Sequence, residues 1–273
     1  MASTKPQRRA EKALKKARTQ KKKFPELLDR IVDTSDVILQ VLDSRFIEET
    51  RNKEVEALIK RKNKKILYVL NKSDLVKKAK LKGLKQVTPY ALVSATKRNG
   101  GKELRDKIKY LAKTVKSDSK ERISVGVIGY PNTGKSSIIN LLIGKKSAKT
   151  GSTAGFTKGL QKLKLTKDIV LVDSPGVIPR KEYSSIDEEK ISQHAIIGAR
   201  DSNKIKNPEL TVAHLIKSRK PLFEKHYKIR FKDAEDFIEQ LGIKKNILKK
   251  KGKVNEDQTA RLVVKEWQSG KIV

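Results

Sequence analysis

The sequence lacks cysteine and is poor in histidine and in aromatic side chains, which form 5% of its 273 residues. Without cysteine, disulfide bonds and thiolate-ligated zinc are excluded, and a reducing compartment is compatible. The three histidines, His194, His214 and His226, have no metal-ligand spacing, so we interpret them as surface or packing residues. No apolar run approaches the roughly 20 residues that span a bilayer, and the basic N-terminus lacks the apolar core of a secretory signal. We therefore expect a soluble, cytoplasmic protein.

Acidic residues are scarce relative to basic ones: 31 Asp and Glu stand against 65 Lys and Arg, for a net charge of +34. Because such an excess repels itself in a compact state, it indicates a polyanionic partner. Nucleic acid is the first candidate, an anionic membrane surface the second, and a merely solvated or salt-adapted surface the third. Lysines cluster at 1–23, 77–85 and 244–253. With few aromatics nearby, they suit the phosphate backbone of folded RNA better than base stacking.

The composition changes along the chain and predicts three parts. Residues 1–23 carry ten Lys or Arg against the single Glu11, which is typical of a disordered basic arm, a helix that forms on a polyanion, or a solvated tail. Residues 24–182 alternate helical and strand patterns. Residues 183–273 show helical periodicity with polar caps and are predicted to form a small helical domain, with helices within 187–201, 207–219, 233–243 and 255–271.

The pattern of residues 24–182 predicts an α/β domain. Apolar runs predict strands at 37–42, 65–70, 90–95 and 122–130 and a hairpin within 158–176, and 3.6-residue periodicity predicts a helix after Phe24 and helices at 52–63, 74–84, 101–115 and 135–144. Because each strand is nearly continuous in apolar residues, we expect a mostly parallel sheet with helices on both faces.

A complete phosphate loop lies between a predicted strand and a predicted helix, in "GYPNTGKSS" at 129–137. Its pattern is Gly129-x-x-x-x-Gly134-Lys135-Ser136. The glycines let backbone N–H groups and the helix N-terminus face phosphates. Lys135 is expected to reach the β and γ oxygens, and the Ser136 hydroxyl to ligate Mg²⁺.

Two further elements follow the phosphate loop. "DSPG" at 173–176 ends an apolar strand, where Asp173 can hold Mg²⁺ and the Gly176 N–H can sense a γ-phosphate. Asp, Ser, Pro and Gly are also the residues of an ordinary turn. We assign the segment to the nucleotide site because it follows the phosphate loop in the chain. A threonine is needed between the two elements to close on the metal, and we choose Thr157, with Thr153 second.

A base-recognition motif, Asn71-Lys72-Ser73-Asp74, ends another predicted strand. The carboxylate of Asp74 can accept from N1–H and N2–H₂ of guanine, two donors that adenine lacks, so it would select GTP over ATP. We expect Lys72 to lie along the base and Asn71 to tie the base loop to the phosphate loop. Ser94-Ala95-Thr96 offers a backbone N–H to guanine O6, although alone it would be a plain strand end.

The order of these elements is unusual, because the base motif precedes the phosphate loop. If a domain with the usual motif order were cut after the strand bearing D-x-P-G and its original termini were joined, its motifs would follow one another in the order found here. Such a circular permutation is sterically easy, because the termini of compact domains are often close together. Through "DVILQVLDSR", "NKSD", "VSAT", "GYPNTGKSSIIN", "AGFTKG" and "DSPGV", residues 25–273 resemble the circularly permuted GTPases of the YlqF/RbgA and YawG type, which act in large ribosomal subunit assembly.

The resemblance implies a circularly permuted P-loop GTPase fold, with a mostly parallel six-stranded sheet between helices and a small all-α C-terminal domain. It implies hydrolysis of GTP to GDP and phosphate, with Mg²⁺ as cofactor, by a monomer that binds ribosomal RNA and the large-subunit precursor. The source organism stays open, although a short, lysine-rich chain without large insertions suggests an archaeal member more than a nuclear one. Alternatives are a catalytically quiet, GTP-gated RNA-binding scaffold and a signalling GTPase unrelated to ribosomes.

The sequence departs from the family at two places: D-A-R-x-P reads Asp43-Ser44-Arg45-Phe46-Ile47, and P-G-x-T reads Ala154-Gly155-Phe156-Thr157. Neither change removes a group that ligates nucleotide. Val177 stands where many GTPases have the glutamine that orients water, so intrinsic turnover should be slow and stimulated by ribosomal particles. In related GTPases an asparagine at the position of Asn132 helps to bind K⁺, which implies K⁺ as activator; alternatively Asn132 only shapes the turn.

The expected site is therefore as follows. Binding of GTP is assigned to Asn71, Lys72, Asp74, Ser94, Ala95, Asn132, Thr133, Gly134, Lys135, Ser136, Ser137, Asp173 and Gly176. Catalytic roles are assigned to Asn132, Lys135, Thr157 and Gly176, Mg²⁺ to Ser136, Thr157 and Asp173, and K⁺ to Asn132. The segment after Gly176 is expected to transmit the switch to the helical domain, with an exposed linker as the alternative.

Overall fold

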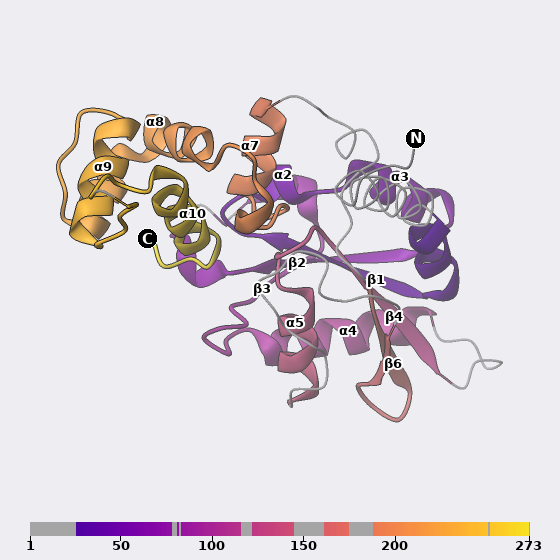
Figure 1. Ribbon diagram of the computed structural model, residues 1–273. Helices are drawn as coiled ribbons and strands as arrows, with labels where there is room; N and C mark the ends of the chain where they lie inside the picture. The colour runs from indigo at the N-terminus through magenta and orange to yellow at the C-terminus, as the bar shows by residue number, and fades with distance from the viewer. Residues whose placement is uncertain are drawn as a thin grey trace, which may run out of the picture.

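The described part of the chain is built around one sheet of six strands. The structure is a computed structural model, and it describes residues 26–77, 81, 83–115, 122–144, 161–174, 188–250 and 252–272. The strand order of the sheet is β3-β2-β1-β4-β6-β5. The strands are β1 (Val37–Asp43), β2 (Lys65–Asn71), β3 (Tyr90–Leu92), β4 (Ile123–Ile128), β5 (Gln161–Lys164) and β6 (Ile169–Asp173). All neighbours pair in parallel except β5, which runs antiparallel to β6. The predicted mostly parallel sheet and its hairpin are confirmed (Figure 1).

Helices cover both faces of this sheet. From β1, Val37, Leu39 and Val41 belong to the core formed with α4 (Gly101–Val115) and α5 (Lys135–Ile143). Ile38 belongs to the core on the opposite face, formed with α3 (Lys53–Arg61) and the helix over residues 26–34. Figure 1 shows α4 and α5 below the sheet and α3 above it. Because both faces are covered, every residue of β1 is buried and its sequence does not alternate.

Side chains cap several of the predicted helices. Asn52 accepts a hydrogen bond from the Val55 N–H at the start of α3. Asp233 caps α9 (Ala234–Lys244) and Asn255 caps α10 (Glu256–Gln268) in the same way. All three helices have acidic residues in the first turn and a basic residue in the last, which suits the helix dipole.

The helix expected over residues 74–84 is wrong. Ser73–Leu75 forms one turn of 3₁₀ helix, residues 76–77 and 83–84 are not helical, and a second 3₁₀ turn covers Lys85–Val87. Lysines recur through this stretch at helical spacing, so a helix there would place like charges together. Leu81 is buried, but Gly83 adopts φ +71°, which interrupts a helix.

The four predicted C-terminal helices are confirmed as α7 (Glu188–Ile196), α8 (Pro208–Tyr227), α9 and α10. α8 was expected to end at Arg219, but it continues through Pro221 after a break at Arg219 (φ −142°, ψ 24°). The shared core of these helices also contains Phe46 and Tyr130 from loops of the sheet part. The helical part therefore packs directly on the sheet part. The predicted domain boundary at residue 182 and the basic arm of residues 1–23 lie outside the described residues.

Within the described ranges, no helix has the length and apolar character needed to cross a membrane. The same ranges contain no cluster of three or more His, Asp or Glu side chains that could hold a metal ion.

Aromatic packing in the helical part generates a stability prediction. Phe223 is fully buried, with ring centroids 6.1 Å from Trp267 and 5.9 Å from Phe237. Phe223→Ala should lower the free energy of unfolding by about 3–5 kcal/mol, because it leaves a cavity. Tyr110, on α4, is 68% exposed, and Tyr110→Ala should change it by less than about 0.5 kcal/mol. Urea unfolding followed by circular dichroism measures both; equal losses would contradict the packing described.

Candidate nucleotide-binding site

The predicted motifs meet at the carboxyl edge of the sheet, where the strand order reverses. The chain leaves β1 for β2 and β3 and then returns to β4 on the other side of β1. In open α/β sheets such a switch point forms the ligand-binding crevice. Asp43 at the end of β1 lies opposite Asn71 at the end of β2, and Asp173 at the end of β6 lies opposite Val127 of β4. Motifs in reversed sequence order therefore share one edge.

The phosphate loop connects β4 to the N-terminus of α5, as the motif predicts, and its glycines are required by its shape. Gly129 has φ +152° and Gly134 has φ +96°. A Cβ at Gly129 would lie 2.5 Å from the Val41 carbonyl oxygen, and one at Gly134 would lie 2.2 Å from Nδ2 of Asn71. The loop is therefore closed against β1 and against the end of β2, and it leads into the N-terminus of α5, where the free N–H groups of a helix can meet phosphates.

Lys135, the first residue of α5, is buried inside this loop. Its Nζ donates to the carbonyl oxygens of Gly129 (3.1 Å) and Tyr130 (2.8 Å). Burial lowers the pKa of Lys135 to about 8, although the charge of Asp173 opposes that shift. The ammonium is thus held ready for an anion, and its protonation depends on pH near neutrality.

Ser136 and Asp173 form a pair of oxygen ligands beside Lys135. The Ser136 hydroxyl donates to Asp173 Oδ2 at 3.2 Å. Among the described residues Oδ1 of Asp173 is buried without a hydrogen-bond partner. Burial raises the pKa of Asp173, against the charge of Lys135. A buried carboxylate with an unused oxygen beside a hydroxyl fits a hard cation such as Mg²⁺.

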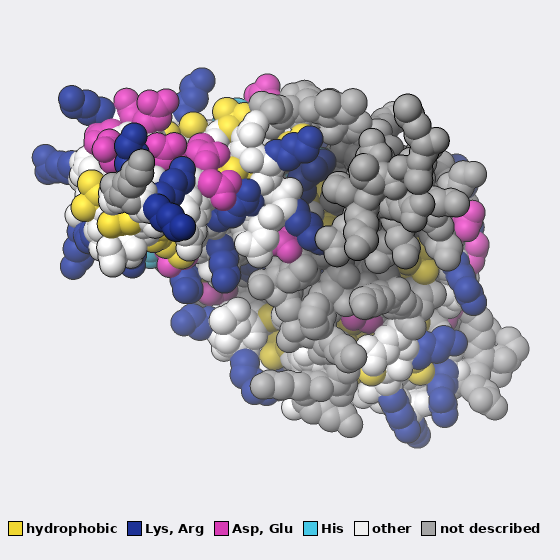
Figure 2. All heavy atoms as spheres, viewed as in Figure 1, with side chains coloured by type: hydrophobic (Ala, Val, Ile, Leu, Met, Phe, Trp, Pro, Cys, Tyr) yellow, Lys and Arg dark blue, Asp and Glu magenta, His cyan; other side chains and the backbone are white. Residues whose placement is uncertain are grey.

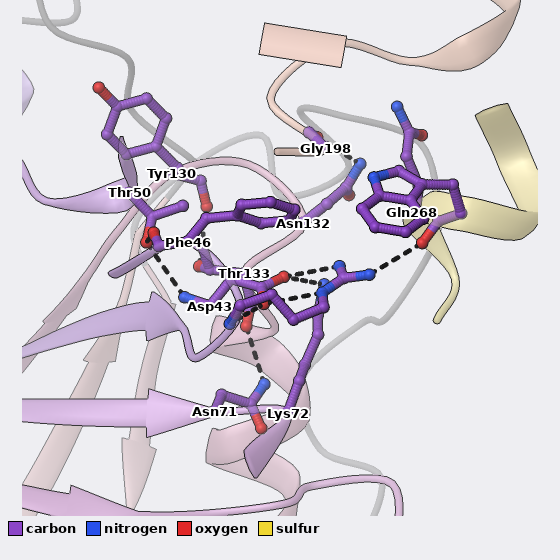
Figure 3. A network of polar contacts seen from close by, with 12 residues as sticks. Asp43, Phe46, Thr50, Asn71, Lys72, Tyr130, Asn132, Thr133, Gly198 and Gln268 are labelled. Atoms are coloured by element: carbon purple, nitrogen blue, oxygen red, sulfur yellow. Dashed lines mark hydrogen bonds and ion pairs between the residues drawn. The ribbon is translucent and has the colours of Figure 1, made fainter. Parts of the chain in front are cut away.

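The side chain of Asn71 joins the two ends of the site. Its Nδ2 donates to the Thr133 carbonyl at 2.8 Å, and its Oδ1 accepts from the Ala95 N–H at 3.1 Å. Asn71 is 3% exposed, and its bond to Thr133 is buried, whereas its bond to Ala95 is partly buried. One amide therefore links the base motif, the phosphate loop and the loop after β3, which is the tie expected from the sequence. Figure 3 shows its contact with Thr133.

The rest of the base motif lies on the same edge. Asp74 is exposed within the 3₁₀ turn Ser73–Leu75, and Lys72 precedes it with φ +59°. The Ser73 N–H donates to the Val93 carbonyl at 3.1 Å, which places Ser94, buried, beside the motif. The carboxylate of Asp74 is therefore accessible to a ligand, as base recognition requires.

Two contacts of the expected residues were not foreseen. Lys72 Nζ lies 2.8 Å from Oδ2 of the buried Asp43. Asn132 donates from Nδ2 to the carbonyl of Gly198 at 2.9 Å, so the phosphate loop contacts the helical part (Figure 3). Asp43 could be noticed in the sequence, because it is the first residue of the segment that corresponds to D-A-R-x-P. Gly198 belongs to no motif.

Some expected residues cannot be placed. Thr157, its alternative Thr153, Gly176 and Val177 lie outside the described residues, as does the segment expected to transmit the switch. Ser137 lies in the first turn of α5, close to the remaining loop residues.

A phosphate loop linked by Asn71 to a guanine motif that precedes it in the chain defines a class, the circularly permuted P-loop GTP-binding proteins. Comparison with known proteins agrees. A family described as "50S ribosome-binding GTPase" matches residues 124–249. An uncharacterized GTP-binding protein of Methanocaldococcus jannaschii is 41% identical over 92% of this chain and 67% of its own length. The chain belongs to the MMR/HSR family of circularly permuted GTPases linked to ribosome assembly.

Other relatives also match more than nine tenths of this chain. Nucleolar GTP-binding protein 2 of Saccharomyces cerevisiae is 36% identical over 93% of this chain, which spans 53% of that protein. The chain therefore spans about half the length of this nucleolar relative. The GNP-bound crystal structure of YlqF from T. maritima has a TM-score of 0.64 at 22% identity, covering 91% of this chain and 94% of that one, and so shows a shared fold.

The pKa of Lys135 makes nucleotide binding depend on pH. Bound phosphates favour the charged form of Lys135, so above pH 8 the lysine must take up a proton when GDP binds. The affinity for GDP should therefore fall by up to about tenfold per pH unit above pH 8. Calorimetric titration between pH 7 and 9 measures this. Lys135→Met, which carries no charge, should bind more weakly with little pH dependence; a wild-type affinity that follows the same pH profile as the variant would contradict the assignment.

Proposed function

We propose that the chain hydrolyses GTP to GDP and phosphate and acts in large ribosomal subunit assembly by binding ribosomal RNA in the subunit precursor, as a cytoplasmic monomer. The link made by Asn71 carries the nucleotide part of this proposal, because it unites a guanine motif and a phosphate loop in one site. The family description and the nucleolar relatives support the ribosomal part.

At the phosphate end, Lys135 supplies a preplaced positive charge. Its Nζ is held on the carbonyls of Gly129 and Tyr130, so it needs little reorganisation to meet the β and γ oxygens. The Ser136 hydroxyl and Asp173 would hold Mg²⁺, which neutralises phosphate charge when bound. Thr157 and Gly176 complete this proposal as the groups that close on the metal and sense the γ-phosphate.

Hydrolysis needs a substitute for the missing water-positioning glutamine, because Val177 can neither donate nor accept. Asn132 is our candidate, through K⁺. Its Nδ2 is engaged by the Gly198 carbonyl, which leaves Oδ1 as the amide atom able to ligate a cation. A K⁺ ion there would add positive charge near the transferring phosphoryl group.

Surface charge supports RNA as the partner. Figure 2 shows Lys and Arg side chains projecting around both parts of the molecule. At the end of α9 and in the hairpin that follows, the exposed lysines are Lys244, Lys245, Lys249, Lys250 and Lys253. Dispersed ammonium groups neutralise backbone phosphates without reading sequence, so binding should weaken steeply with salt.

Single-turnover GTP hydrolysis, alone and with large ribosomal subunits, tests the proposal. We expect slow turnover alone and an acceleration of at least about tenfold with subunits, measured in K⁺, with a smaller rate in Na⁺ at equal ionic strength. Lys135→Ala is the control and should lose both rates.

The outcomes separate the alternatives. GTP-dependent binding to subunits without accelerated hydrolysis would favour the quiet scaffold. Hydrolysis that is indifferent to subunits, with no binding to them, would favour a signalling GTPase. Equal rates in K⁺ and Na⁺ would contradict the role of Asn132 in binding K⁺.

A further inference from the structure

A buried carboxylate lies behind the guanine motif and has two cationic partners. Asp43 is 0% exposed. Its Oδ2 lies 2.8 Å from Nζ of Lys72 and 2.8 Å from Nη2 of Arg45, and its Oδ1 accepts from Nε and the backbone N–H of Arg45 at 3.0 Å each. Burial would raise the pKa of Asp43, but the charge of Lys72 and the hydrogen bonds of Arg45 outweigh it and lower the pKa to about 2. The carboxylate is therefore ionised throughout the neutral range.

Arg45 is fixed on every side. Its fork holds both oxygens of Asp43, and its remaining Nη1 donates to the carbonyl of Trp267 at 3.0 Å, at the end of α10. The guanidinium carbon lies 5.2 Å from the ring centroid of Phe46 and 5.4 Å from that of Trp267. The bidentate geometry fixes the plane of the carboxylate, so Oδ2 is directed at Lys72. Figure 3 shows this network reaching α10.

The residues that follow α10 lie close to the turn that contains Asp74. Gly270 has φ +74°, and a Cβ there would lie 2.6 Å from Cδ1 of Leu75. Leu75 belongs to the same 3₁₀ turn as Asp74. The indole N–H of Trp267 donates at 2.9 Å to the carbonyl of Ile196, the last residue of α7, so this end of α10 is itself held by the end of α7.

We propose that Arg45 is a positioning residue of the guanine site: through Asp43 it holds the ammonium of Lys72 so that the lysine stem lies over the base, and α10 completes the site by holding Arg45. A lysine stem that is ordered before the nucleotide arrives loses less rotamer entropy on binding. The proposal rests on GTP binding, described above, and does not depend on hydrolysis or on ribosomes.

Affinity for a fluorescent GDP analogue, with Mg²⁺, tests the proposal. Arg45→Met should raise Kd about tenfold, equivalent to about 1.4 kcal/mol. Arg51→Met is the matched control: Arg51 pairs with Glu48 (3.0 Å) and Glu56 (2.7 Å) and lies over the Tyr68 ring, with its side chain 11% exposed. It should change Kd by less than about twofold. Arg45→Lys, which keeps the charge but not the fork, should be intermediate.

A double-mutant cycle separates positioning from a general structural role. If Arg45 acts through Lys72, then Arg45→Met should change Kd by less than about twofold when Lys72 is already Ala. An equal effect in both backgrounds, or an equal effect of the Arg45 and Arg51 variants, would overturn the proposal. If Arg45→Met does not fold, Arg45→Lys is compared in the same cycle. Because only binding is measured, failure here is distinct from failure of the proposed hydrolysis.

Discussion

The hydrogen bonds of one buried amide, that of Asn71, hold the nucleotide site together. Its donor end reaches the Thr133 carbonyl in the phosphate loop, and its acceptor end takes the Ala95 N–H in the loop after β3. Gly134 must be a glycine because this amide passes 2.2 Å from where a Cβ would lie. The base end and the phosphate end therefore occupy one rigid edge of the sheet. Their order in the chain is irrelevant to the contact, because parallel strands bring their carboxyl ends together in any order.

The helical part is built onto both ends of this site. The Gly198 carbonyl accepts from Asn132 in the phosphate loop, and the Trp267 carbonyl accepts from Arg45 beside the base motif. Gln268, the residue after Trp267, connects these two contacts. Its Nε2 donates to the carbonyls of Ala195 (2.7 Å) and Arg200 (2.9 Å), which lie on either side of Gly198 in the chain. Both ends of the nucleotide site are thus hydrogen-bonded to the helical part.

Much of this arrangement could be predicted from the sequence because its signals are local. Continuous apolar runs gave the parallel strands, polar caps and periodicity gave the C-terminal helices, and the motif order revealed the permutation. The helix expected at 74–84 did not form, and lysines three and four residues apart, such as Lys77 and Lys80 or Lys78 and Lys82, would place like charges together on such a helix. The partnership of Arg45 with Trp267 and that of Asn132 with Gly198 could not be foreseen, since each joins residues far apart in the chain and no composition marks a backbone carbonyl as an acceptor.

Asn71 joins the early N-K-x-D motif to the later phosphate loop, so Asp74 is expected to recognise guanine in the site that holds the phosphates. Competition between GDP and xanthosine diphosphate (XDP) for the wild-type chain and for Asp74→Asn measures this, because xanthine carries an oxygen at C2, where guanine carries the amino group that donates to Asp74. The wild type should prefer GDP, and Asp74→Asn should lose affinity for GDP by on the order of a hundredfold and gain affinity for XDP. Unchanged GDP affinity in the Asp74→Asn variant would contradict it.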